Sequence, residues 1–248
     1  MHILALDIGN TRTSTGHFIH DCLTTREDIE TNTLPKALHN IANTPLDIAI
    51  ISCVSQRMAF VTDEIRQILS CPVIFIDPAS APIKIHYDNP KSVGQDRIVN
   101  ALGAKYHVKG GAIVIDTGTA THFDIIDPQG EFWGGPILAG IETMHQALTN
   151  RIIHLPQFQL HPQIDPISQN TISAMNTGTI LCAAGGIERI VYEIRKQLTY
   201  PVQTILTGGN AHLIKPHIAY DIWAPNLTLQ GLCQYAKYFL QNSTKISA

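Results

Sequence analysis

The chain has 248 residues, of which 44% are hydrophobic and 15% charged, and its formal net charge is −3 with histidine counted as neutral. This length exceeds one average domain, and the apolar content is ample for a buried core. The slightly acidic balance, with no block of five or more like charges, lacks the electrostatic footprint of a protein that binds nucleic acid or an anionic membrane. We therefore expect a globular protein with neither kind of partner.

The N-terminus and the cysteines bear on the cellular compartment. Residues 1–7 hold no basic region and no small-residue cleavage site, and the apolar run stops at Asp7, far short of a membrane span. The five cysteines are dispersed without a C-x-x-C pair, which argues against a disulfide framework and against a zinc site. The histidines show no metal-ligand spacing. We expect a cytoplasmic protein.

The first part of the chain opens with a predicted hairpin. An apolar run at 2–8 breaks at Gly9-Asn10, and a second run follows at 13–19. Apolar spacing and proline content then predict, in order, a helix at 34–41, a strand at 47–54, a helix at 60–69, a strand at 73–76, a loop at 77–92 and a helix at 94–106.

The opening pattern returns at residue 112. An apolar run at 112–115 leads to Asp116-Thr117-Gly118-Thr119, and a second strand is expected at 121–126. In both places hydrophobic residues lead to Asp-x-Gly-x with a threonine beside it, and then to another strand. Similarity at this distance indicates a duplicated domain, with the boundary near Gly110.

The second part continues the alternation of strands and helices. The patterns predict a strand at 132–138, a helix at 141–148, an irregular segment at 155–167, an amphipathic helix at 187–198, strands at 202–206 and 219–224, and a closing helix at 227–240. Strands with helices between and after them indicate the α/β class. Two similar halves predict a cleft between them, with ligands at the loops where strands end.

Two turns have the composition of phosphate-binding loops. In Asp7-Ile8-Gly9-Asn10-Thr11-Arg12, the glycine permits close approach of backbone N–H donors to phosphates, and Asp7 can hold Mg²⁺ through water. By itself this motif is equally well explained as an ordinary turn. Asp116-Thr117-Gly118-Thr119-Ala120-Thr121 has the same ingredients, and two such turns at equivalent places would clamp a nucleotide's phosphates from both sides.

Two further motifs each allow two interpretations. In Gly94-Gln95-Asp96-Arg97, Asp96 is either a helix cap or the base that accepts a proton from a substrate hydroxyl, and Arg97 can bind an anionic group. In Thr207-Gly208-Gly209-Asn210, the glycines either let a base or ribose lie against the backbone or form an ordinary strand-to-helix turn. The second interpretation is favoured for that motif alone.

These four motifs, in this order, resemble those of type III pantothenate kinases, which belong to the actin, sugar-kinase and heat-shock ATPase superfamily. The resemblance covers essentially the whole chain, and a general sugar kinase is not expected to carry the Gly-x-Asp-Arg element. It implies an α/β fold of two duplicated ribonuclease-H-like, actin-like ATPase domains, at 1–110 and 111–248, with a nucleotide cleft between them. The implied reaction is phosphorylation of pantothenate by ATP to 4′-phosphopantothenate, the first step of coenzyme A biosynthesis.

The resemblance also implies residue roles. The ATP-binding residues would be Asp7, Ile8, Gly9, Asn10, Thr11, Arg12, Thr13, Ser14 and Thr119. The substrate-binding residues would be Tyr87, Gly94, Gln95, Asp96, Arg97 and Thr171. Asp96 would be the catalytic base, and Asp116 would bind an activating K⁺ or NH₄⁺ ion. In the family the threonine that matches Thr171 comes from the partner subunit, which implies a homodimer with a shared substrate site.

One residue departs from the family pattern, and two other functions compete with the kinase assignment. Ala139, in Gly134-Gly135-Pro136-Ile137-Leu138-Ala139-Gly140, stands where the family usually has proline, which concerns loop rigidity. A sugar kinase or exopolyphosphatase of the same fold is one rival, although a polyphosphatase favours a basic channel. A catalytically silent relative that acts as an accessory transcriptional regulator is the other. The presence of Asp7, Asp96, Arg97 and Asp116 favours an active enzyme.

Overall fold

The computed structural model describes residues 1–41, 44–53 and 58–246, and the chain divides into two compact units. Unit 1 comprises Met1–His107 together with Asn226–Ala248, and unit 2 comprises Val108–Pro225. The division after His107 lies close to the boundary expected at Gly110. The closing helix differs from the expectation, since it belongs to unit 1 and not to the second domain.

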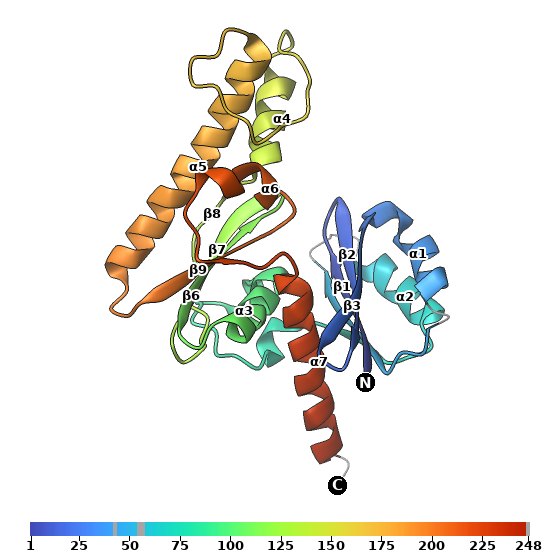
Figure 1. Ribbon diagram of the computed structural model, residues 1–248. Helices are drawn as coiled ribbons and strands as arrows, with labels where there is room; N and C mark the ends of the chain where they lie inside the picture. The colour runs from blue at the N-terminus through green and yellow to red at the C-terminus, as the bar shows by residue number, and fades with distance from the viewer. Residues whose placement is uncertain (42–43, 54–57, 247–248) are drawn as a thin grey trace. The chain divides into compact units, whose positions relative to one another are not determined.

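Unit 1 is built on a five-stranded sheet in the order β3-β2-β1-β4-β5 (Figure 1). Strands β1, β2 and β3 pair antiparallel, whereas β4 pairs parallel to both β1 and β5. The elements are β1 (His2–Ile8), β2 (Arg12–Ile19), β3 (Cys22–Glu30), η1 (Thr31–Thr33), α1 (Leu34–Ile41), β4 (Ile48–Cys53), α2 (Met58–Ile68), β5 (Val73–Phe75), η2 (Pro78–Ser80), η3 (Pro90–Ser92), α3 (Gln95–His107) and α7 (Leu227–Ile246). The predicted hairpin is confirmed; Val54, expected to end the β4 strand, lies outside the described residues.

Both faces of this sheet are covered by helices. Successive side chains of a strand point to opposite faces. Ile3 and Ala5 of β1 pack in one cluster with residues of α3 and α7, whereas Leu4, Leu6 and Ile8 pack in a second cluster with residues of α1 and α2. A strand buried on both faces reads as a continuous apolar run, which is the pattern of residues 2–8. Asp7 shares its face with Ile3 and Ala5, the side of α3.

Glycines explain why the C-terminal helix packs within unit 1. A Cβ atom on Gly231 of α7 would clash with the Val99 carbonyl of α3 and lie 2.6 Å from its carbon. A Cβ atom on Gly103 of α3 would in turn clash with the Leu227 carbonyl. The backbones of α3 and α7 therefore cross in direct contact, and Thr228 adds a 2.8 Å hydrogen bond from its hydroxyl to Asn100 Oδ1.

Unit 2 has its own five-stranded sheet, in the order β10-β9-β6-β7-β8. Its elements are β6 (Gly111–Thr117), β7 (Ala120–Ile126), β8 (Ile137–Ala139), α4 (Ile141–Arg151), α5 (Thr171–Gln197), β9 (Val202–Thr207), α6 (Ala211–Ile214), η4 (Lys215–His217) and β10 (Ile222–Trp223). One face of the sheet, including Ile113, Ile115 and Phe123, packs against α5 and α6. None of the helices within the described ranges is both long and apolar enough to cross a membrane.

The two sheets have the same topology, which confirms the predicted duplication. In each, a central strand pairs antiparallel with the following strand and parallel with a later one, β1 with β2 and β4, and β6 with β7 and β9. Asp7 and Asp116 are the penultimate residues of the two central strands. The sequence repeat therefore places both carboxylates at equivalent strand ends.

Two segments of unit 2 differ from the expectation. The strand expected at 132–138 is reduced to β8, because Gly134 and Gly135 have φ values of 83° and 144°, and a Cβ on Gly135 would clash with the Phe123 carbonyl. Helix α5 has 27 residues, far more than the expected 187–198. Its N-cap is Asn170, whose side chain accepts a 2.9 Å hydrogen bond from the Ser173 N–H.

Candidate active site

The turn after β1 has the compact geometry that the first motif predicts. The Gly9 N–H donates a 3.0 Å hydrogen bond to the Arg12 carbonyl, and a Cβ on Gly9 would lie 2.8 Å from that oxygen. Thr31 holds the turn from the other side, donating its hydroxyl to the Gly9 carbonyl at 2.9 Å and its N–H to the Thr11 carbonyl at 3.0 Å. The turn is therefore fixed before any ligand binds.

Exposure divides the eight residues of this loop into two groups. Asn10, Thr11 and Arg12 are exposed at the tip, where their donors can reach an anion. Ile8 and Thr13 are fully buried, and the half-buried Ser14 donates its hydroxyl to Asp28 Oδ1 at 2.5 Å. We infer that Ile8, Thr13 and Ser14 support the loop, and that the tip residues offer donors to phosphates.

The segment with Asp96 is attached to the strand next to Asp7. Gln95 Oε1 accepts a 2.8 Å hydrogen bond from the Cys53 N–H, and Cys53 pairs with Ile8 across β4 and β1. Asp96 lies in the first turn of α3, and its Oδ1 accepts a 2.8 Å hydrogen bond from the Arg97 N–H. The N-terminus of α3 therefore lies beside the end of β1, and the motifs at Asp7 and Asp96 meet within unit 1.

The other substrate-binding candidates of unit 1 differ in exposure. Arg97 is only 4% exposed, so its side chain is held inside the unit. Tyr87, in the loop between η2 and η3, is 39% exposed. A Cβ on Gly94 would clash with the Asp96 carboxylate. The glycine at position 94 therefore leaves the space that the Asp96 carboxylate occupies.

The turn after β6 is bounded by the end of β9. Gly208 has a φ of 98°, and a Cβ there would lie 2.5 Å from Asp116 Oδ1 and 2.6 Å from the Thr117 carbonyl oxygen. Asn210 donates its N–H to the Thr117 carbonyl at 2.8 Å and its side-chain amide to the Gly118 carbonyl at 3.3 Å. The Thr207-Gly208-Gly209-Asn210 motif therefore holds the loop of Asp116, which is more than an ordinary strand-to-helix turn requires.

Thr119 is the exposed tip of this second turn. Its carbonyl accepts hydrogen bonds from the Gly140 N–H at 3.0 Å and from the Thr143 hydroxyl at 2.6 Å. A Cβ on Gly140 would lie 2.5 Å from the same carbonyl oxygen. The start of α4 thus fixes the backbone of Thr119 and leaves its side chain outward. Ala139, at the position where proline is usual, ends β8 opposite Ala120.

Thr171 is the first residue of α5 in unit 2. Figure 1 shows α4 and α5 side by side, joined by a long loop. Several large apolar side chains of this region are exposed. They are Leu148, Ile152, Ile153, Ile167, Ile172 and Leu181, with Ile153 90% and Ile167 82% exposed. Exposed apolar side chains in one region are typical of an interaction surface.

Sequence reasoning missed His122 and Asp124, which accompany Asp116 on the same sheet. His122 Nε2 lies 3.6 Å from Asp116 Oδ2, and His122 Nδ1 lies 3.1 Å from Asp124 Oδ2. The alternation along β7 could have shown that His122 and Asp124 share a face with each other, but only the register places them on the face of Asp116. Across the ranges that the structure covers, three or more His, Cys, Asp or Glu residues do not gather in an arrangement able to hold a metal ion. A cation at Asp116 would therefore need oxygen ligands besides side-chain carboxylates.

Comparison with known proteins identifies the family. The family model described as type III pantothenate kinase matches residues 3–193. A type III pantothenate kinase of Parafrankia sp. (strain EAN1pec) is 34% identical over 247 residues, which cover 93% of this chain and 95% of that protein.

Solved structures support the fold. A conserved Campylobacter jejuni protein, placed provisionally in the Baf family of transcriptional activators, aligns with a TM-score of 0.62 and 18% identity over 96% of this chain and 99% of that one. MreB5 of Spiroplasma citri with bound ADP aligns with a TM-score of 0.55 and 12% identity over 98% of each chain. At these identities the likeness shows the fold alone. The expected duplicated α/β fold of the actin-like ATPases is confirmed.

Proposed function

The chain belongs to the type III pantothenate kinase family, and from that premise we propose how its residues carry out the reaction. The enzyme phosphorylates pantothenate with ATP, giving 4′-phosphopantothenate and ADP, the first step of coenzyme A biosynthesis. The observation that carries the assignment of residues is the hydrogen bond from the Cys53 N–H to Gln95, because it attaches the Asp96 segment to the strand beside Asp7.

Asp96 acts as the base in this proposal. Its carboxylate accepts the proton of the primary hydroxyl of pantothenate, the hydroxyl oxygen forms a bond to the γ-phosphorus, and the bond from phosphorus to the ADP oxygen breaks. Phosphoryl transfer depends mainly on positioning and charge stabilisation, so one well-placed carboxylate is enough. The hydrogen bond from the Arg97 N–H holds the Asp96 carboxylate at the start of α3. Tyr87, Gly94, Gln95 and Arg97 bind pantothenate.

The turn after β1 binds the phosphates of ATP. Its exposed tip, residues Asn10, Thr11 and Arg12, supplies the donors, and the compact turn at Gly9 keeps them in place without a ligand. Asp7 is half-buried at the strand end, where a carboxylate can hold Mg²⁺ through water. Mg²⁺ that arrives with ATP neutralises phosphate charge when bound.

Asp116 is the proposed ligand of a monovalent cation, K⁺ or NH₄⁺, and Thr119 contacts ATP. The surroundings of Asp116 suit such an ion, because carboxylate and carbonyl oxygens are the ligands that hard cations prefer. The Thr117 carbonyl and Asp116 Oδ1 both lie beside Gly208, where a side chain would displace them. Bound there, the cation supplies positive charge near the phosphates.

The homodimer is also part of the proposal. The exposed apolar residues of α4, α5 and the loop between them support a partner subunit on this surface, and Thr171 at the start of α5 lies in the same region. Each subunit would then contribute its Thr171 to the substrate site of the other. A cytoplasmic location agrees with the cysteines, since none of the five, all within the described residues, forms a disulfide.

The reaction is tested by supplying ATP, Mg²⁺ and pantothenate with either K⁺ or Na⁺ as the monovalent cation, and measuring ADP release. Turnover that depends on both pantothenate and K⁺ is expected. Turnover that is equal in K⁺ and Na⁺ would refute the cation role of Asp116 but not the kinase reaction. In the variant Asp116→Asn, the difference in turnover between K⁺ and Na⁺ should disappear.

The shared site is tested by mixing two inactive variants, Asp96→Asn and Thr171→Trp. If Thr171 serves the partner's site, random pairing gives heterodimers with one intact site, and roughly a quarter of the parent activity returns. If Thr171 serves its own subunit, every site of the heterodimer carries one of the two lesions, and no activity returns. As a reciprocal test, the Asp96 and Thr171 changes are combined in one chain. Mixing that double variant with the parent restores a site only when both residues come from one subunit.

A further inference from the structure

A cavity of about 400 Å³ lies in unit 1, at the end of β1 where the chain begins. It is lined by residues of β1, β2, β3 and α1, and by the segment between α1 and β4. His2, at the cavity, is the first residue of β1, whereas Asp7 is the sixth, which separates them by about 16 Å along the strand. The cavity is therefore distinct from the turn that is proposed to bind phosphates.

The strand register explains why this part of the sheet is open. Leu4 of β1 packs in one cluster with residues of α1, and His17 of β2 pairs with Leu4. Thr25 of β3 pairs with His17, and Glu27 follows two residues later on the same face. The face that α1 covers at β1 thus continues on β2 and β3 as polar side chains, which line the cavity instead of a hydrophobic core.

A β-bulge lies at the cavity wall. The register of β2 against β3 shifts between His17 and Phe18, and Thr24 donates its hydroxyl to the His17 carbonyl at 3.0 Å. A bulge changes the direction of the side chains beside it. The bulge therefore bears directly on how the His17 ring is presented to the cavity.

The charges of the lining favour a cation over an anion. The described residues that line the cavity include neither lysine nor arginine, and Glu27 supplies a carboxylate that forms no ion pair with another described residue. Burial lowers the pKa of His17, although the negative charge of Glu27 opposes this shift. The His17 ring is therefore neutral near pH 7, and one of its nitrogens can accept a hydrogen bond. ATP and pantothenate are anions, so this lining suits neither of them.

Apolar groups form much of the remaining wall. Ile19, Ala37, Ile41 and Leu46 line the cavity, and Asn40 of α1 adds a side-chain amide. A volume of roughly 300–1,000 Å³, apolar walls and a few polar groups are usual for sites that bind small molecules. The cavity has this composition, with its carboxylate at Glu27.

We propose that this cavity binds a small organic cation, with the ammonium group of the ligand at the Glu27 carboxylate and its apolar body between β2 and α1. A nitrogen of His17 accepts a second hydrogen bond from the same ammonium group. A metal ion fits less well, because in the described parts of the chain three or more His, Cys, Asp or Glu residues do not gather in an arrangement able to hold one. The inference is independent of the proposed reaction.

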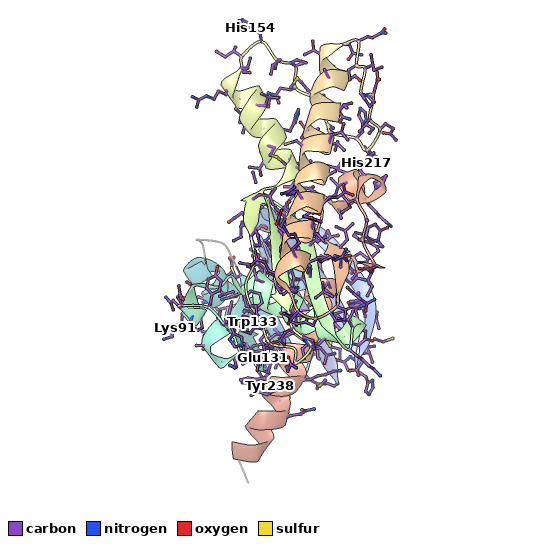
Figure 2. All side chains as sticks on the ribbon, turned by 90° about the vertical axis from the view of Figure 1, so that its left-hand side faces the viewer. Lys91, Glu131, Trp133, His154, His217 and Tyr238 are labelled. Carbon is purple, nitrogen blue, oxygen red and sulfur yellow. The ribbon has the colours of Figure 1, made fainter. Side chains whose placement is uncertain are left out.

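Three indole compounds of similar size but different charge test the proposal. Tryptamine carries an ammonium group, tryptophol a hydroxyl and indole-3-acetate a carboxylate. Each is titrated to millimolar concentration into the full-length protein, and NMR spectroscopy follows the histidine ring signals, with that of His17 assigned by its loss in His17→Gln. The ring of His154, exposed in the loop after α4 (Figure 2), is the internal reference.

We expect tryptamine to shift the His17 signal in a saturable manner and to leave the His154 signal unchanged. Tryptophol should bind about three- to fivefold more weakly, which is the contribution of a partly exposed ion pair, and indole-3-acetate should leave the His17 signal unchanged. Glu27→Gln should reduce the affinity for tryptamine to that for tryptophol. Glu188→Gln, at an exposed position of α5 in unit 2, is the matched control and should keep the parent difference.

A second variant locates the binding in the cavity. Ala37→Phe places a ring in the cavity from α1 and should abolish the shifts caused by tryptamine and tryptophol. Tryptamine that does not shift the His17 signal, or that binds no more tightly than tryptophol, would overturn the proposal. Binding that persists in Ala37→Phe, or a preference for tryptamine that persists in Glu27→Gln, would overturn it as well. Glu27 is exposed, so Glu27→Gln carries the test if Ala37→Phe does not fold.

Discussion

The close contact of α3 and α7 predicts that replacing a helical glycine by alanine destabilises the protein, although this change usually stabilises a helix. Gly231→Ala in an exposed helix would stabilise by about 1 kcal/mol, because alanine has the higher helix propensity. Here the new Cβ would clash with the Val99 carbonyl, lie 2.6 Å from its carbon and lie 3.1 Å from the Gly103 nitrogen. All three atoms are backbone, so the helices must move apart, and overpacking of this kind costs about 1–3 kcal/mol or more.

We therefore expect Gly231→Ala to lower the free energy of unfolding of unit 1 by about 2 kcal/mol, equivalent to about 4–8 °C in melting temperature. Urea unfolding of unit 1 is followed by labelling of the Cys233 thiol, which is buried on α7. Trp133 and Trp223 report on unit 2 by fluorescence. Gly185→Ala in α5 is the matched control, since a Cβ there meets nothing within 4 Å and should stabilise unit 2. A Gly231→Ala protein as stable as the parent would refute the close crossing.

Three further predictions concern single side chains. Asp96→Asn should lower kcat by roughly 10²–10⁴ with little change in melting temperature, because the amide cannot accept the hydroxyl proton; near-normal kcat would exclude Asp96 as the base. Burial raises the pKa of Cys233 to about 11, so at about pH 8 iodoacetamide should modify exposed Cys182 and leave Cys233 unmodified in the folded protein, as peptide mass spectrometry would show. Burial alone would raise the pKa of Asp221, but hydrogen bonds from the Thr204 N–H and hydroxyl lower this pKa below its ordinary value. The stability that the Asp221 carboxylate provides is therefore complete above the pKa of the unfolded state and is lost as the pH falls through the pKa of the folded state. The urea midpoints of Asp221→Asn and the parent should converge as the pH is lowered through that range.

The sequence was sufficient for the central strands because their signals are local. The apolar runs that end in Asp7 and Asp116 predicted both hairpins, and the repeat predicted the common topology of the two sheets. It was not sufficient for β3, which pairs only with β2 at the sheet edge and is polar along most of its length. An edge strand with exposed faces lacks the apolar alternation by which strands are recognised.

Long-range contacts account for the remaining differences. The part of α5 that precedes Ile187 carries Gly178 and the pair Gly185-Gly186, which weaken a helix signal although the structure leaves space around each of them. The place of α7 in unit 1 depends on Gly103 and Gly231, more than a hundred residues apart, and no local pattern links them. The partners of Asp116 were missed because His122 was read as one of many histidines, while its strand register was known only from the structure.

The most direct test of the proposed function is the identity of the phosphorylated product. The purified protein is incubated with ATP, Mg²⁺, K⁺ and an equimolar mixture of pantothenate and glucose, with Asp96→Asn as the matched control, and the products are separated by mass spectrometry. The proposed function predicts 4′-phosphopantothenate in an amount equal to the ADP formed, and almost none from the variant. Phosphorylated glucose, or ADP without phosphopantothenate, would contradict it.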